Sequence, residues 1–224
     1  SADKLLASEN KLRIGGYAQI YYNQPIVNGQ YSNGNLDVHR LVMIFKYKFS
    51  GKTQFLTEIE FEHVKEVYIE QAFLQNRFNK YLNFRAGLMI VPMGLINEYH
   101  EPTTFNGVER PNIDKYIVPT TWREIGAGFS GRFESISLKY QAYIFNGFKS
   151  YDEGAVLSSG SGLRSGRQKG AESIMRSPNL SIKVDFFGLP GLNLGIATYL
   201  GKTQSTLYKG LDRDDIFSIA QADS

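Results

Sequence analysis

The chain has 224 residues and no cysteine, so it holds one large domain or two small ones and lacks disulfides, thiol catalysis and cysteine-ligated metal centres. Its 25 lysines and arginines against 22 aspartates and glutamates give a formal charge of +3, too small an excess for a nucleic-acid-binding domain. Although 42% of the residues are hydrophobic, no run of 18 apolar residues occurs, which excludes a transmembrane helix but not a transmembrane β-barrel.

Apolar and polar side chains alternate along most of the chain, which is the pattern of β-strands with two different faces. In the segment from Arg40 to Phe49, for example, apolar residues occupy every odd position. A further segment over 66–75 is rich in strand-forming residues, but its two faces cannot be told apart. The remaining predicted strands cover residues 12–22, 40–49, 54–62, 82–91, 124–133, 136–145, 180–187 and 192–200.

The lengths of the connections favour a membrane barrel over a soluble β-sandwich. The apolar faces carry no charge, and the strands are long enough for tilted membrane spans. Short turns are expected at the periplasmic side and long loops at the outer side. The predicted turns are 50–52, 76–80, 134–135 and 188–191, and the predicted long loops are 23–39, 92–123 and 146–179.

Aromatic residues gather where strands meet the short turns, as in the girdle of a membrane–water interface. They are Tyr47, Phe49, Phe78, Tyr81, Phe133, Phe186 and Phe187. We therefore predict an all-β protein with a single domain over residues 1–224, an antiparallel transmembrane barrel of the outer-membrane porin type. Nine strands is an odd number, so we expect these residues to be the N-terminal part of a larger barrel.

Several segments, by their order and spacing, resemble the phosphate-selective porin O and P family, in particular members from Bacteroidota. The resemblance covers most of residues 11–147 and weakens beyond them. Its segments are Leu36–Leu41, Val67–Phe73, Phe84–Leu88, Val91–Leu95, Val108–Arg110, Ile125–Gly131 and Tyr140–Gly147.

The resemblance implies a barrel of about 16 strands in the outer membrane of a Gram-negative bacterium, a homotrimer that passes small anions such as phosphate. It also implies that the loop over 92–123 folds inward and narrows the pore, with basic residues lining the constriction. By position these are Arg85, Arg110, Lys115 and Arg123. The same loop contains Glu98, Glu101 and Glu109, so we expect a mild anion preference instead of tight phosphate binding.

Four basic residues on the predicted wall complete the candidate anion path: Arg40, Lys46, Lys139 and Lys183. Rows of such cations in a water-filled lumen attract anions. The alternative is that they pair with Glu58, Glu60 and Glu124 and only stabilise the wall. Lys139 and Lys183 are expected farther from the constriction than the loop cations, and therefore to matter less.

No catalytic residue, cofactor or metal site is predicted. His39, His63 and His100 fall at strand ends or in loops and are interpreted as solvated, and residues 160–166 as a flexible Gly/Ser-rich loop. The expected partners are outer-membrane lipid and small solutes, with no nucleic acid. Two other functions stay open: a scaffold barrel in a larger secretion or uptake complex, and a soluble β-rich binding module.

Overall fold

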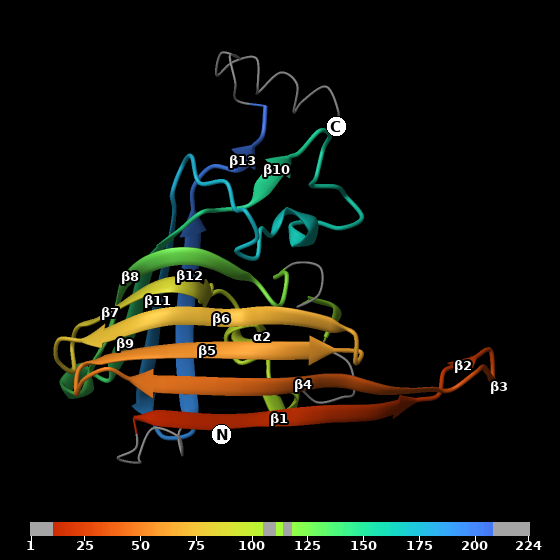
Figure 1. The fold of residues 1–224 in the computed structure, drawn as a ribbon, viewed down its shortest axis with the longest axis horizontal. Coiled ribbons are helices and arrows are strands. Elements are labelled where there is room, and N and C mark those ends of the chain that lie inside the picture. Colours follow the sequence, from red (N-terminus) through yellow and green to blue (C-terminus); the bar gives the residue numbers. More distant parts are fainter. Residues whose placement is uncertain (1–10, 105–110, 114–117, 208–224) are drawn as a thin grey trace.

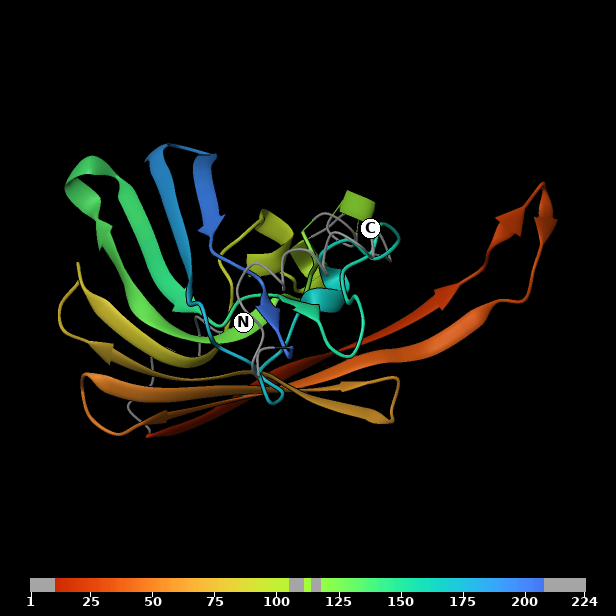
Figure 2. The same cartoon turned by 90° about the horizontal axis from the view of Figure 1, so that it is seen from above.

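The computed structural model describes residues 11–104, 111–113 and 118–207. Nine long strands form one antiparallel sheet in which each strand pairs with the next in the order β1-β4-β5-β6-β7-β8-β9-β11-β12 (Figure 1). The sheet curves into an open trough, and its edges in the described part of the chain are β1 and β12 (Figure 2). The strands are β1 (Leu12–Asn23), β4 (Asn35–Lys48), β5 (Thr53–Glu62), β6 (Glu66–Arg77), β7 (Asn83–Ile90), β8 (Arg123–Phe133), β9 (Leu138–Phe145), β11 (Asn179–Leu189) and β12 (Leu192–Leu200).

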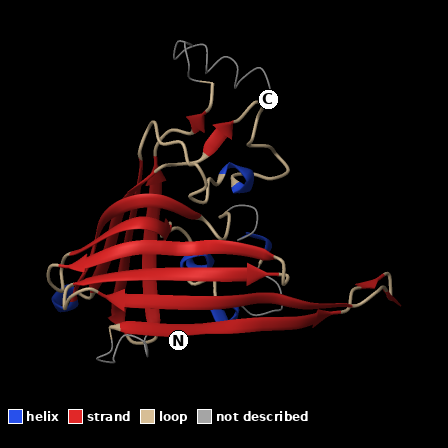
Figure 3. Cartoon of the chain, in the orientation of Figure 1, coloured by secondary structure: helices blue, strands red, loops and turns tan. Residues whose placement is uncertain are grey.

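The remaining elements are short (Figure 3). They are β2 (Ile26–Val27), β3 (Gln30–Tyr31), β10 (Lys149–Tyr151), β13 (Gln204–Ser205), α2 (Leu95–Glu98), η1 (Pro102–Thr104), η2 (Glu134–Ile136) and η3 (Arg164–Gly166). In the residues that the structure describes, no helix has both the length and the apolar character needed to cross a bilayer.

The predicted antiparallel strands are confirmed, with three corrections. Residues 23–39 are not a simple long loop, because β4 already begins at Asn35 and the arm that it forms with β1 ends in the β2–β3 hairpin. The strand predicted over 136–145 begins at Leu138, since Ser137 adopts a left-handed turn conformation with φ 53°. The connection over 63–65 lies at the same end of the sheet as the long loops but is short, so not every connection at that end is a long loop.

The two faces of the sheet are inverted relative to a soluble protein. Leu41 and Ile125 are 43% and 44% exposed, whereas Arg40 and Glu60 on the opposite face are 3% and 2% exposed. The predicted outward direction of the apolar faces is therefore confirmed, and a sandwich with these residues in a closed core is excluded. A polar concave face and an apolar convex face are the arrangement of a barrel wall in lipid.

A β-bulge explains why the faces of β6 are ambiguous in the sequence. Glu58 pairs with Gln71 while the next residue, Ile59, pairs with Ile69, which leaves Glu70 without a partner on β5. Because a bulge inserts one extra residue, the alternation changes phase at Glu70. Glu70 and Gln71 both point to the concave face, although they are adjacent in the chain.

The predicted aromatic residues are exposed or half-buried next to the turns that join β4 to β5, β6 to β7 and β8 to β9. We call the ends of the strands at these turns the turn end of the sheet, and the opposite ends the loop end. Tyr81 stacks on Phe133 with ring centroids 5.3 Å apart, and Tyr47 contacts Phe49 at 5.0 Å. The Arg132 guanidinium lies 3.7 Å from the centre of the Phe187 ring. Amphipathic contacts of this kind suit a membrane–water interface.

A small apolar cluster lies on the concave side and fixes the loops there. Trp122, at the end of the loop after β7, stacks on Phe148 at 4.5 Å and meets Tyr199 of β12 edge-on at 4.6 Å. These rings pack with inward-facing side chains of the sheet: Phe73, Met89, Tyr143 and Phe145. The long loops are thereby anchored inside the trough.

Candidate functional site

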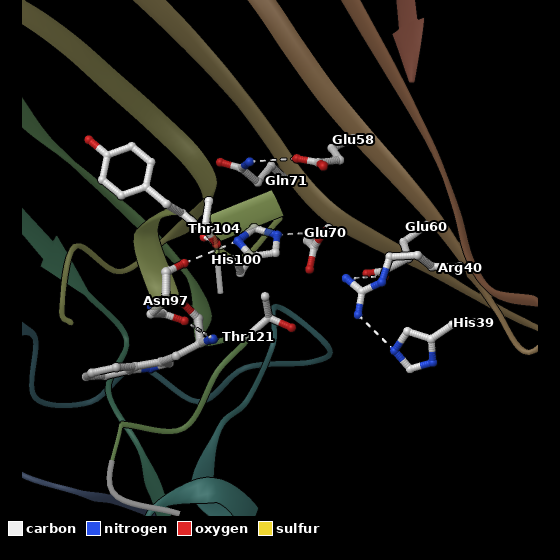
Figure 4. Close-up of polar contacts among 12 residues, drawn as sticks. His39, Arg40, Glu58, Glu60, Glu70, Gln71, Asn97, His100, Thr104 and Thr121 are labelled. Carbon is white, nitrogen blue, oxygen red and sulfur yellow. Dashed lines mark hydrogen bonds and ion pairs between the residues drawn. The ribbon is translucent and has the colours of Figure 1, made fainter. Parts of the chain in front are cut away.

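One buried side chain joins the two ends of the loop after β7, and we call this junction the neck of the loop. Asn97 of α2 donates from Nδ2 to the carbonyl oxygens of Val91, at 2.7 Å, and Trp122, at 3.2 Å. Its Oδ1 accepts the backbone N–H of Trp122 at 2.6 Å. Since Val91 and Trp122 are the two ends of the loop, Asn97 fixes α2 relative to the sheet (Figure 4).

From this position Glu98 reaches across the trough to β9 and β11. Its carboxylate accepts a hydrogen bond from Gln141, at 2.7 Å, and forms ion pairs with Lys183 and with Lys139, the latter at 3.5 Å. Lys183 also lies 3.4 Å from Asp185. Burial raises the pKa of Glu98, but the hydrogen bond from Lys183 and the charge of Lys139 outweigh it and hold the pKa below its usual value. Lys139 and Lys183 therefore contact the loop through Glu98.

On the other side of the loop, His100 contacts the β6 wall. Its Nε2 lies 3.1 Å from Glu70 Oε2, and only 5% of the residue is exposed. The interpretation of His100 as a solvated loop histidine is wrong, because the residue is buried against the β6 wall. The contacts of Glu98 and His100 join one short helix to strands on both sides of the trough.

Between the loop and the wall lies an open cavity of about 480 Å³. Basic and acidic side chains both line it: Arg85, Arg132 and Lys139 from the strands, and Glu98 from α2. Arg85 donates from Nε to Gln75 at 3.0 Å, and its guanidinium lies 5.0 Å from the centre of the Phe73 ring. These neighbours are neutral, so the Arg85 charge stays available to a solute.

Arg85 belongs to a group of cations near the turn end, which we call the basic wall group. Lys46 lies near the positive charges of the other four members, and its Cα pairs with that of Arg13 across the β1–β4 ladder. Among the described residues no ion pair joins Lys46, Arg77 or Arg85 to a carboxylate. The basic wall group consists of Arg13, Lys46, Lys48, Arg77 and Arg85.

At the loop end Arg40 has a carboxylate partner, whereas Arg123 and Lys169 lie beside the same aromatic ring. Arg40 forms an ion pair with Glu60 at 3.0 Å, and both side chains are 3% exposed. Arg123 lies at the start of β8 with its guanidinium 5.8 Å from the centre of the Tyr68 ring. Lys169 lies 5.9 Å from the same ring, and burial together with the charges of Arg167 and Arg123 lowers its pKa.

The predicted path residues thus fall into separate places. Arg85 and Lys139 line the same cavity, and Lys139 and Lys183 meet on Glu98. Arg85 and Arg123 do not meet, because they lie five residue pairs apart on the β7–β8 ladder, roughly 16 Å at about 3.3 Å per residue. Arg110, Lys115 and Glu109 lie outside the described residues.

Sequence reasoning missed Asn97, Glu70 and Trp122. The alternation of β6 breaks at Glu70, and that irregularity was the available signal for a bulge. No pattern in the sequence marks Asn97, because its partners are main-chain groups at the two ends of a loop.

A second polar group lies at the loop end of β4. The Asp37 carboxylate is 2.6 Å from His63 Nδ1 and 3.5 Å from His39 Nδ1, and His39 Nε2 is 3.2 Å from the Arg40 guanidinium. His39 lies within β4 and His63 in the turn after β5, so neither is part of a long loop.

Two sequence comparisons with known proteins give matches over most of the chain. The sequence profile described as phosphate-selective porin O and P matches residues 12–177. A curated protein of Aquifex aeolicus (strain VF5) is 34% identical over 227 residues, an alignment that covers 97% of this chain. The chain spans about half the length of that relative, 50%.

Among solved structures, a loop L8 deletion mutant of OmpT, an outer membrane protein of Vibrio cholerae, is similar with a TM-score of 0.37 and 9% sequence identity. That similarity covers 86% of this chain and 70% of the other.

Proposed function

Because this chain belongs to the phosphate-selective porin O and P family, we propose that it forms wall and loop of an outer-membrane porin for passive diffusion of small hydrophilic solutes, with a mild anion preference. The observation that carries the proposal is that the charged face of the sheet is buried and its apolar face is exposed, the opposite of a soluble protein. The charged face is also the concave one (Figure 2). Such a wall is stable with lipid outside and water inside. Passage through it breaks no bond, so the proposal includes no catalytic step.

We further propose that additional strands close the barrel in the outer membrane of a Gram-negative bacterium, and that three copies associate. Among the described residues β1 and β12 are open edges of the sheet, which supports the first point, since unpaired N–H and C=O groups are costly in hydrocarbon. The half-length match to the relative supports it as well. The trimer follows from family resemblance and is tested by crosslinking of the full-length protein in detergent.

The loop over 92–123 is proposed as the constriction. Two observations support this role: the contacts of Glu98 with β9 and β11, and the contact of His100 with β6. Both contacts hold α2 over the concave face. Solutes would then pass through the space between the loop and the wall, where Arg85 lies.

The anion preference is assigned to the basic wall group instead of to all eight predicted cations. Arg40, Lys139 and Lys183 each have a carboxylate partner, which offsets their fields. Lys46, Arg77 and Arg85 are the members that keep net positive charge near the turn end. The offset of the charges of Arg40, Lys139 and Lys183 explains why the preference should be mild.

Reversal potentials in a salt gradient test the assignment. In planar bilayers with the full-length protein, Arg85→Gln should move the reversal potential toward cation selectivity, and adding Lys46→Gln and Arg77→Gln should move it further. Lys139→Gln is the matched control, because it removes the same charge from the same cavity at a site already paired with Glu98. Equal shifts for Arg85→Gln and Lys139→Gln would refute the assignment, and a well-folded protein without conductance would favour the scaffold alternative.

A further inference from the structure

Three buried side chains from different segments converge where the constriction loop meets the wall (Figure 4). They are Glu58 of β5, Glu70 of β6 and His100 after α2, and they are 6%, 0% and 5% exposed. One carboxylate or imidazole atom from each lies within 4.8 Å of the others. None of the three takes part in the proposed anion path.

The bulge in β6 creates this convergence. Because Glu70 has no partner on β5, it and Gln71 both face inward, next to Glu58. Gln71 donates from Nε2 to Glu58 Oε2 at 2.8 Å and orients that carboxylate. Bulges often re-aim a side chain at a functional site, and here the result is two carboxylates side by side.

His100 is oriented as a metal ligand would be. Its Nδ1 lies 3.2 Å from the carbonyl oxygen of Asn97, so Nδ1 carries the proton and donates to that oxygen. In the neutral ring the lone pair is then on Nε2, which points at Glu70. Metal-binding histidines commonly hold their second nitrogen in this way, with a carbonyl or carboxylate as acceptor.

The charges at this place are not balanced by arginine alone. Arg40 forms its ion pair with Glu60, which leaves the carboxylates of Glu58 and Glu70. In the described part of the chain, no lysine or arginine forms an ion pair with Glu58 or Glu70; His100 contacts Glu70 at 3.1 Å, and Glu60 lies beside it, although Glu70 is fully buried. Arg123 acts on Glu70 by its charge from a greater distance. Two buried carboxylates without a full set of donors match the charge of one divalent cation.

We propose that Glu58, Glu70 and His100 bind a divalent transition-metal ion of the Zn²⁺ class, which crosslinks the constriction loop to the barrel wall. Two carboxylate oxygens and one imidazole nitrogen are ligands that Zn²⁺ accepts, and a three-residue set leaves a coordination position for water. The bound ion joins β5, β6 and the segment after α2 and fixes the loop. The proposal does not depend on ion selectivity, because it needs only the fold.

The group at Asp37, His39 and His63 is a less suitable site, although its atoms are also within 4.8 Å of one another. Arg40 donates to His39 Nε2, so the proton of neutral His39 is on Nδ1, the nitrogen that faces Asp37. A metal at that nitrogen would have to displace the proton and tolerate the nearby guanidinium. This group therefore supplies the control.

Metal binding to the full-length, chelator-treated protein in detergent tests the proposal. Calorimetry should show one Zn²⁺ per chain, and Co²⁺ should give a visible absorption band that Zn²⁺ abolishes. Glu70→Gln and His100→Gln should each weaken Zn²⁺ binding by about tenfold or more, since each removes one ligand, whereas His63→Gln should leave it unchanged. The Co²⁺ band needs no variant, so the test does not depend on whether the substituted proteins fold.

The opposite results are equally distinct. If the parent protein binds no Zn²⁺, or if Glu70→Gln and His100→Gln bind it as tightly as the parent, the three residues form only an ion pair between loop and wall. Loss of binding in His63→Gln alone would place the metal at the outer histidines and overturn the proposal. Neither result bears on whether the barrel conducts, which the reversal potentials measure separately.

Discussion

The loop end and the turn end of the concave face are built from the same kinds of residue but differ in how charge is compensated. At the loop end Arg40 pairs with Glu60, and His100 contacts Glu70. At the turn end Lys46 and Arg85 have no carboxylate partner in the described part of the chain. The same kind of cation therefore pairs with a carboxylate at one end, whereas Lys46 and Arg85 at the other end have no such partner among the described residues.

The difference can be traced to one strand. The inward-facing residues of β5 change from Gln54 and Leu56 near the turn end to Glu58, Glu60 and Glu62 near the loop end. Across the neighbouring ladder, Lys48 pairs with Gln54, whereas Arg40 pairs with Glu62 and forms its ion pair with Glu60. The position of a basic residue along the strand thus decides whether it meets a carboxylate, and residue type alone does not.

The largest expected effect comes from removing a cation that forms an ion pair with a buried carboxylate. Arg40→Ala should destabilise the protein by about 3–5 kcal/mol, because it leaves Glu60 buried and unpaired beside Glu70. Lys46→Ala is the matched control on the same strand and face, at 4% exposure. It should cost much less, because it removes a charge that like charges surround.

Urea unfolding of both variants from lipid vesicles measures this difference. Adding Glu60→Gln to Arg40→Ala should recover part of the lost stability, since the unpaired charge is then removed. Equal costs for Arg40→Ala and Lys46→Ala would mean that the two ends do not differ in compensation.

The difference between the two ends of the concave face also requires that the convex, apolar face lie in lipid. Substitution of two outward-facing leucines tests this. Leu41 lies at the middle of β4, and Leu36 lies on the arm beyond β5, 74% exposed. Leu41→Arg should cost about 2–4 kcal/mol and Leu36→Arg only about 0–1, because the penalty for a charge in lipid falls from the bilayer midplane to the interface. Folding titrations into vesicles measure both, and similar costs would place Leu41 away from the midplane.

Much of the fold could be predicted from the sequence, because strand alternation is a local signal. The charge-free faces of β1 and β4 predicted the outward side, and the register of the sheet follows from them. The pairing alternative was also foreseen for Arg40 and Glu60. These two residues are close in the sheet because adjacent strands are joined by a short turn.

The site was less accessible to sequence reasoning, because its contacts join segments far apart in the chain. Glu98 meets Lys183, and His100 meets Glu70, only after the loop has folded back into the trough. The phase change at Glu70 hides which face that residue occupies. A loop histidine looks solvated when its own neighbours are polar, and its burial here is produced by strands that the local sequence does not contain.

The smallest of the expected effects concerns the neck that keeps the loop at one end of the wall. Asn97→Ala should cost about 1–3 kcal/mol, because it leaves the carbonyl of Val91 and the N–H of Trp122 without their side-chain partner. Asn83→Ala is the control at the turn end, where Asn83 donates one bond to the carbonyl of Ser130 at 3.2 Å. Its expected cost is about 1 kcal/mol or less.

Limited proteolysis separates the two variants better than global stability does. With the neck weakened, α2 loses its fixed place, so Asn97→Ala should speed cleavage within 92–122 while Asn83→Ala leaves that rate unchanged. The basic wall group is held by the strands and not by the neck, so the Arg85 environment should persist in both variants. If Asn97→Ala leaves the loop as protected as in the parent, the contacts of Glu98 and His100 with the wall are sufficient to hold it, and the neck adds nothing that they do not supply.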